Sequence, residues 1–168
     1  MSNLAVMPII IPLFAGILVA FFHKKLSLAR ALSKLFILFN LVVVVYIAYT
    51  VFESGNIILE TGSWEAPYGI IFVADPFSIL LVLTTNILSV ACLFIAPKLV
   101  SEEKEGFYFY TFVFLLISGV SGAFLTGDLF NLFVFFEVLL MASYGLIVLG
   151  GNKTQLRESL KYVLINLF

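Results

Sequence analysis

The chain has 168 residues, of which 62% are hydrophobic and 11% are charged. A soluble domain is about 45–50% apolar and about 25% charged, so this composition excludes a soluble enzyme and predicts an integral membrane protein in a lipid bilayer. Nine basic and ten acidic residues give a net charge of -1, so there is no electrostatic attraction to nucleic acid. Cys92 is the only cysteine, which excludes an internal disulfide. The sequence has no metal-ligand spacing, and we expect no metal and no cofactor.

Five stretches reach the roughly 20 apolar residues that a helix needs to cross a bilayer. In chain order they cover about residues 4–22, 32–52, 77–96, 107–125 and 129–149. A sixth begins near Leu160 and has only about half the required length at Phe168. A half-span leaves backbone carbonyls unpaired in hydrocarbon, so we expect a fragment of a longer protein. The predicted fold is an all-α integral membrane protein with five complete transmembrane helices and the start of a sixth.

One long connection, about residues 53–74, separates the second and third spans. It contains two short β-prone runs, Ile57–Thr61 and Ile70–Val73, with glycine and proline turn signals between them, and this pattern predicts a short external β-hairpin. Asp75 followed by Pro76 is typical of a helix start, and Pro97 is expected to close the third span.

All nine basic residues fall on alternate connections or, as Lys34 does, just inside the span that follows. They follow the first, third and fifth spans, whereas the connections after the second and fourth spans carry only acidic residues: Glu53, Glu60, Glu65, Asp75 and Asp128. Because basic loops stay in the cytoplasm, we expect the N-terminus to face outside.

Glu137 is the one charged residue deep inside a span. A charge at the bilayer centre costs at least about 2.5–3.5 kcal/mol, and such acids are functional by default. Apolar neighbours favour the neutral carboxyl, so a carrier that loads and unloads protons needs a nearby cation, and no other span supplies one deep enough. The alternative is a permanently protonated Glu137 that hydrogen-bonds a neighbouring helix.

Several polar residues are possible supports for Glu137. Tyr144 shares its helix face. Ser118 and Ser121 lie in a stretch of small residues that permits close helix packing, although their hydroxyls could hold water beside Glu137. Asp128 is interpreted as a helix cap, with an entry-site acid as the alternative. Lys161 either reaches inward or extends to the cytoplasmic surface.

The run around Glu137 resembles the fifth transmembrane helix of the antiporter-like subunits shared by respiratory complex I and the Mrp-type Na+/H+ antiporters. Three other stretches are similar to the same family. The four segments are GDLFNLFVFFEVLLMASYGLIVLG, GSWEAPYGIIFVADPFSILL, MPIIIPLFAGILVAFF and ESLKYVLINLF.

The resemblance implies the N-terminal part of a longer, multi-pass protein in a bacterial cell membrane. Residues 1–127 would hold the first four helices with the hairpin, and residues 128–168 the start of the proton-translocating core. It implies a secondary transporter subunit rather than an enzyme, with other antiporter subunits as partners and H+ and Na+, or another monovalent cation, as cargo. Glu137 would pair with a lysine beyond Phe168.

Two other interpretations stay open. One is a proton-pumping subunit of an NADH:quinone oxidoreductase, which would make the assembly an enzyme. The other is a passive membrane scaffold in which Glu137 stays protonated.

Overall fold

The computed structural model describes residues 2–63 and 69–167; Glu65, counted among the acidic residues of the hairpin connection, lies outside them. A 3-10 turn, Ser2–Val6, precedes the first helix. The helices are α1 (Met7–Phe21), α2 (Leu26–Ser54), α3 (Pro76–Leu99), α4 (Glu102–Gly106), α5 (Phe109–Leu125), α6 (Leu129–Val148) and α7 (Lys153–Leu167). Two strands, β1 (Ile57–Glu60) and β2 (Ile71–Ala74), lie between α2 and α3.

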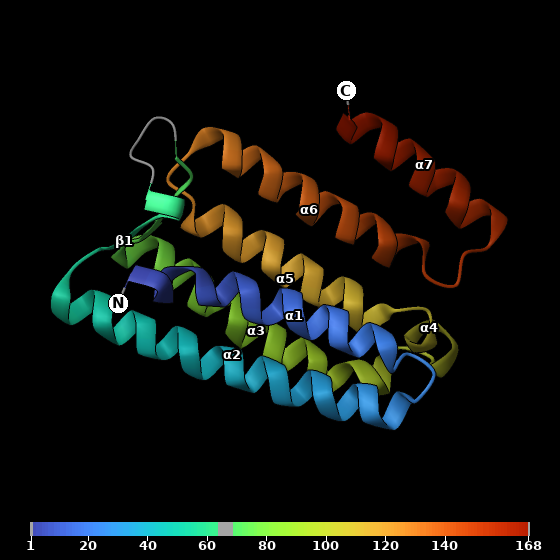
Figure 1. Cartoon of the computed structure of the whole chain (residues 1–168). Helices are drawn as coiled ribbons and strands as arrows, with labels where there is room; N and C mark the ends of the chain where they lie inside the picture. The colour runs from blue at the N-terminus through green and yellow to red at the C-terminus, as the bar shows by residue number, and fades with distance from the viewer. Residues whose placement is uncertain (1, 64–68, 168) are drawn as a thin grey trace.

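The long helices lie side by side in one bundle, with the N-terminus and the hairpin at the same end (Figure 1). α1 packs against both α2 and α5, and α3 completes this group by packing on α2 and α5. α6 packs on α5, whereas α7 has far less contact and touches mainly α6. The first five helices therefore form the packed body of the bundle, and α6 with α7 forms its edge.

Four helical segments of the described chain are long and apolar enough to cross a membrane. These are Asn3–Phe21, Leu26–Ser54, Pro76–Leu99 and Leu129–Val148. α5 is also apolar but has only 17 residues. Large apolar side chains such as Phe14 and Val42 are exposed on the outer faces of these helices. A bundle that is apolar both inside and outside is typical of a multi-pass membrane protein.

Two apolar clusters form the interior. The cluster at the hairpin end joins α1, α2, β2, α3 and α5 through Ile9, Ile47, Phe72, Ile79 and Leu125, one residue from each. The second cluster lies toward the opposite end and contains Val19, Ile37, Leu93, Phe114 and Ile117.

The expected hairpin is confirmed. β1 and β2 are antiparallel, with Ile57 opposite Ala74 and Glu60 opposite Ile71. The hairpin is also fixed to the bundle, because the N–H of Gly127 donates to the Ile71 carbonyl at 2.8 Å. The hairpin therefore holds the connection between α5 and α6.

The start of α3 is confirmed, but its end is not where the sequence predicted. Asp75 accepts a 2.7 Å hydrogen bond from the Ser78 N–H, and the Ser78 hydroxyl accepts one from the Asp75 N–H, which makes a capping box. Pro97 does not close the helix, which continues to Leu99. A proline removes only its own N–H, and the bond from the Val100 N–H to the Ala96 carbonyl completes the final turn.

The start of the sixth segment also differs from the prediction. α7 begins at Lys153, well before Leu160. The first part of α7 is polar, so its hydropathy does not mark a span, although Lys, Gln, Leu, Arg and Glu all favour helix.

Candidate functional site around Glu137

Glu137 lies near the middle of α6 and is half-buried. Its side chain lines a pocket of about 350 Å³ between α5 and α6. The other walls of this pocket, called here the Glu137 pocket, are apolar and include Phe112, Leu115, Val134, Val138 and Met141. The acid identified from the sequence is therefore in apolar surroundings, as its helix face predicted.

In the part of the chain that the structure describes, the Glu137 carboxyl has no hydrogen bond or ion pair. Chemically, such a group can accept and release a proton only if water or a cation also reaches it.

Close packing between α5 and α6 fixes one side of this site. A Cβ atom at Gly119 would lie 2.8 Å from the Leu139 backbone nitrogen, and one at Gly122 would overlap the Phe135 ring. Only glycine permits this approach, which agrees with the small-residue spacing seen in the sequence. α6 is therefore seated directly on α5 beside Glu137.

Asp128 caps α6. Its carboxylate accepts hydrogen bonds from the backbone N–H groups of Phe130 at 3.1 Å and Asn131 at 3.2 Å. The Asn131 side chain in turn donates to the Thr126 hydroxyl at 3.0 Å. The interpretation of Asp128 as a cap is confirmed. The cap sets where α6 starts and hence the position of Glu137 along the length of the bundle.

The two serines of α5 have different surroundings. The Ser118 hydroxyl donates to the Ile9 carbonyl at 3.0 Å and so joins α5 to α1. The Ser121 hydroxyl is buried and has no partner among the described residues. Ser118 therefore has a packing role, because it joins α5 to the turn of α1 that precedes Pro12.

Tyr144 and Lys161 belong to the contact between α6 and α7. The Tyr144 ring packs edge-on against Tyr162, with 5.6 Å between ring centroids. The Lys161 ammonium lies 2.8 Å from Glu158, one turn earlier on α7, and its side chain is exposed. Lys161 is thus paired on its own helix and does not supply the cation that Glu137 lacks.

A buried ion pair at the end of the bundle was missed by the sequence analysis. The Arg30 Nε donates to the Glu105 carboxylate at 2.7 Å, and the Glu105 side chain is fully buried. The second Glu105 oxygen and the Tyr110 hydroxyl are buried without hydrogen-bond partners among the described residues. Glu105 lies within a short run of charges between two spans, so nothing in the sequence separates it from its solvated neighbours.

Comparison with known proteins agrees with this arrangement. No protein-family model matches the chain. The chain is 54% identical over 168 residues, its whole length, to the D subunit of a Na(+)/H(+) antiporter from Alkalihalophilus pseudofirmus, and it covers 34% of that protein. The chain is similar from end to end to the N-terminal part of an antiporter D subunit.

Two solved structures share the fold. One is the Mrp complex from Dietzia sp. DQ12-45-1b, with a TM-score of 0.85 and 31% identity over 99% of this chain and 31% of the matched chain. The other is the membrane-bound sulfane sulfur reductase, an archaeal respiratory membrane complex, with a TM-score of 0.88 and 26% identity over 98% of this chain and 34% of the matched one. The chain spans about a third of the length of the curated relatives it matches.

Proposed function

We propose that the chain is part of a membrane subunit of a multisubunit Na+/H+ antiporter, in which Glu137 belongs to a transmembrane relay for protons or monovalent cations. The observation that carries the proposal is the position of Glu137, half-buried in the middle of a membrane helix and facing an otherwise apolar pocket. The 54% identity to an antiporter D subunit supports the same assignment.

In this proposal the Glu137 carboxylate takes a proton from water and later returns it to water on the other side. In its protonated form the carboxyl is neutral, and in its charged form it attracts a cation. Alternation between the two states couples proton movement to cation movement. The cation would come from a part of the protein beyond residue 168, or from another subunit.

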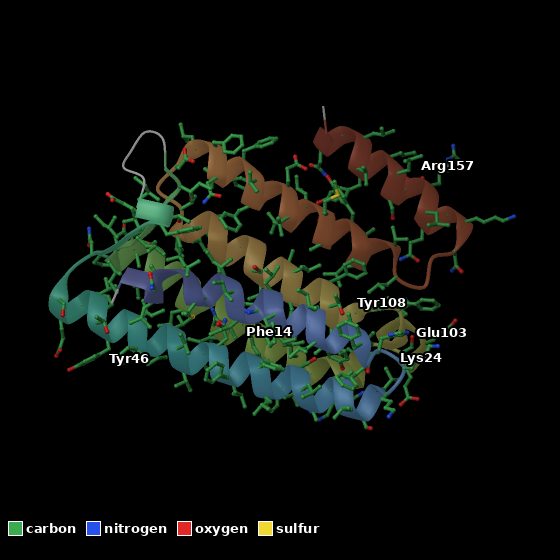
Figure 2. The ribbon with its side chains drawn as sticks, viewed as in Figure 1. Phe14, Lys24, Tyr46, Glu103, Tyr108 and Arg157 are labelled. Carbon is green, nitrogen blue, oxygen red and sulfur yellow. The ribbon has the colours of Figure 1, made fainter. Side chains whose placement is uncertain are left out.

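Five crossings, with α5 as the fourth, complete the proposed topology. A helix of 17 residues is at the lower limit for a membrane span. The basic residues of three connections lie at the bundle end opposite the hairpin, and Figure 2 shows Lys24 there. With that end in the cytoplasm of a bacterial cell, the N-terminus and the hairpin face outside. Residues 1–127 then form the supporting part of the subunit, and residues 128–168 begin the translocating core.

Replacement of Glu137 in the full-length subunit tests the relay. Within its complete complex in everted membrane vesicles, we expect Glu137→Gln to reduce Na+/H+ exchange, followed with a pH-sensitive dye, to the background of vesicles without the complex. Glu137→Asp keeps the carboxyl and should retain part of the exchange. Glu53→Gln is the control, because Glu53 is exposed at the end of α2 and, among the described residues, hydrogen-bonds only Tyr49. Normal exchange by an assembled Glu137→Gln complex would refute the relay.

A second candidate follows from the likeness to the archaeal respiratory complex. In that case the subunit moves protons within a redox-driven assembly and Glu137 keeps its role. Purification of the native complex separates the two candidates, because a respiratory assembly carries redox subunits and an antiporter does not.

A further inference from the structure

Two lysines at one end of the bundle have no acidic partner among the described residues. Lys34 lies on α2, about 12 Å along the axis from the first residue of that helix, and Lys98 lies in the last turn of α3. Both are therefore near the end opposite the hairpin, called here the basic end. Arg30, one turn before Lys34, is in contrast held by Glu102 and Glu105. The charges of Lys34 and Lys98 are thus uncompensated within the described chain.

The Phe94 ring of α3 brings these two charges to one groove between α2 and α3. The Lys34 ammonium crosses from α2 and lies over this ring, 5.2 Å from its centroid, in a cation–π contact. Residues 94 and 98 are one turn apart, so the Lys98 side chain leaves α3 from the same face as the ring. An ammonium group has three N–H donors, and those directed away from the ring remain available. Both lysines therefore have donors for one anion seated beside Phe94.

Exposed apolar side chains continue the groove from the lysines toward the hairpin end. On α3, Leu80, Ile87 and Phe94 repeat every seven residues and are all exposed, so they form a line along one face of the helix, called here the apolar line. On α2, Leu38 is exposed one turn after Lys34. The groove thus joins a positively charged end to an apolar line, which is the pattern that binds an anionic amphiphile.

We propose that the groove between α2 and α3 binds one anionic glycerophospholipid at the basic end, with its phosphate between the Lys34 and Lys98 ammonium groups and an acyl chain along the apolar line. The phosphodiester carries a single negative charge and accepts charge-assisted hydrogen bonds from both lysines. A zwitterionic lipid brings a third cation into the site, so it binds less well. Free phosphate leaves the apolar line uncovered, which favours the lipid. This site is independent of the Glu137 relay.

Fluorescence quenching by brominated lipids measures binding at this groove. In the full-length subunit, assembled in its complex with native cysteines replaced, Ala91→Cys places a thiol on an exposed position one turn before Phe94. A small bimane label there is quenched only by lipids in contact with it. In phosphatidylcholine vesicles, titration with brominated phosphatidylglycerol or brominated phosphatidylcholine gives the relative association constant of the two lipids. We expect phosphatidylglycerol to be preferred by about 25-fold, about fivefold for each lysine.

Matched variants separate this site from the general charge of the basic end. Lys34→Gln and Lys98→Gln should each lower the preference about fivefold, whereas Lys34→Arg keeps the charge and should retain it. Lys24→Gln removes the same charge at the same end, from the connection between α1 and α2 (Figure 2), and should leave the preference unchanged. A label at Phe39→Cys is the positional control, because Phe39 is exposed about 140° around α2 from Lys34.

Each other outcome would overturn the proposal. Equal quenching by the two lipids at position 91 would mean that the groove does not select an anionic headgroup. A preference at position 39 as strong as that at position 91 would mean that the whole basic end attracts anionic lipid without a site. A preference that survives both Lys34→Gln and Lys98→Gln in an assembled complex would remove the lysines from the site. Absence of quenching by either lipid would mean that protein, and not lipid, covers the groove.

Discussion

The Asn40 side-chain amide donates a 2.6 Å hydrogen bond to the amide oxygen of Asn86, and both side chains are fully buried between α2 and α3. The Asn86 amide also donates to the Val82 carbonyl of its own helix at 2.9 Å. Two amides in apolar spans therefore bind each other, as polar side chains between membrane helices commonly do, and the buried Asn40 side-chain oxygen has no partner among the described residues.

We expect Asn86→Leu to lower the free energy of unfolding of the protein in detergent by about 1–2 kcal/mol, because the buried Asn40 amide loses its acceptor. The double variant with Asn40→Leu should lose less than the sum of the two single changes, since no unpaired amide is then left. Equilibrium unfolding of the four proteins of this double-mutant cycle measures the coupling. Strict additivity would mean that the pair contributes nothing specific.

Arg30 binds two carboxylates of very different exposure, which permits a matched comparison. The Glu105 carboxylate lies 2.7 Å from the Arg30 guanidinium and its side chain is fully buried. The Glu102 carboxylate lies 3.2 Å from the same guanidinium, and its side chain is 77% exposed. A surface pair contributes little, but loss of a buried partner leaves unpaired groups. We expect Glu105→Gln to lower the melting temperature clearly and Glu102→Gln to leave it nearly unchanged, both measured by thermal unfolding of the purified protein. Equal effects would mean that burial of Glu105 does not matter.

The features predicted from the sequence are those set by local patterns. Hydropathy located the long helices and placed Glu137 inside one, the Asp75-Pro76 pair marked the start of α3, and turn residues marked the hairpin. Each of these signals lies within one helix turn or one span, so the chain alone carries it.

Contacts between helices could not be predicted in the same way. The Arg30–Glu105 pair and the close approach of Gly119 to Leu139 depend on which helix faces meet, and residues far apart in sequence decide this. Asn40 and Asn86 did carry a signal, because an amide in an apolar span needs a partner. The sequence alone does not say, however, which residue of which other span is the partner.

Ser118 and Ser121, one turn apart on α5, offer a second matched pair. Ser118 donates to the Ile9 carbonyl at 3.0 Å, whereas the buried Ser121 hydroxyl has no partner among the described residues. We expect Ser118→Ala to lower the free energy of unfolding by about 1 kcal/mol. Ser121→Ala should change it by no more than about 0.5 kcal/mol. Chemical denaturation of both variants is the measurement, and a larger loss for Ser121→Ala would show that Ser121 has a partner outside residues 2–63 and 69–167.

Gly119 controls how closely α6 approaches α5. A Cβ atom there would lie 2.8 Å from the Leu139 nitrogen and 3.0 Å from its Cα, and a backbone cannot turn aside as a side chain can. We therefore expect Gly119→Ala to push the helices apart and to lower the free energy of unfolding by about 1–3 kcal/mol. Gly106→Ala, with open space around the new methyl group, should have no such effect.

Equilibrium unfolding of the two variants is the measurement. Equal free energies of unfolding would mean that α6 moves away from α5 at no cost, and that the close approach at Gly119 does not stabilise the bundle.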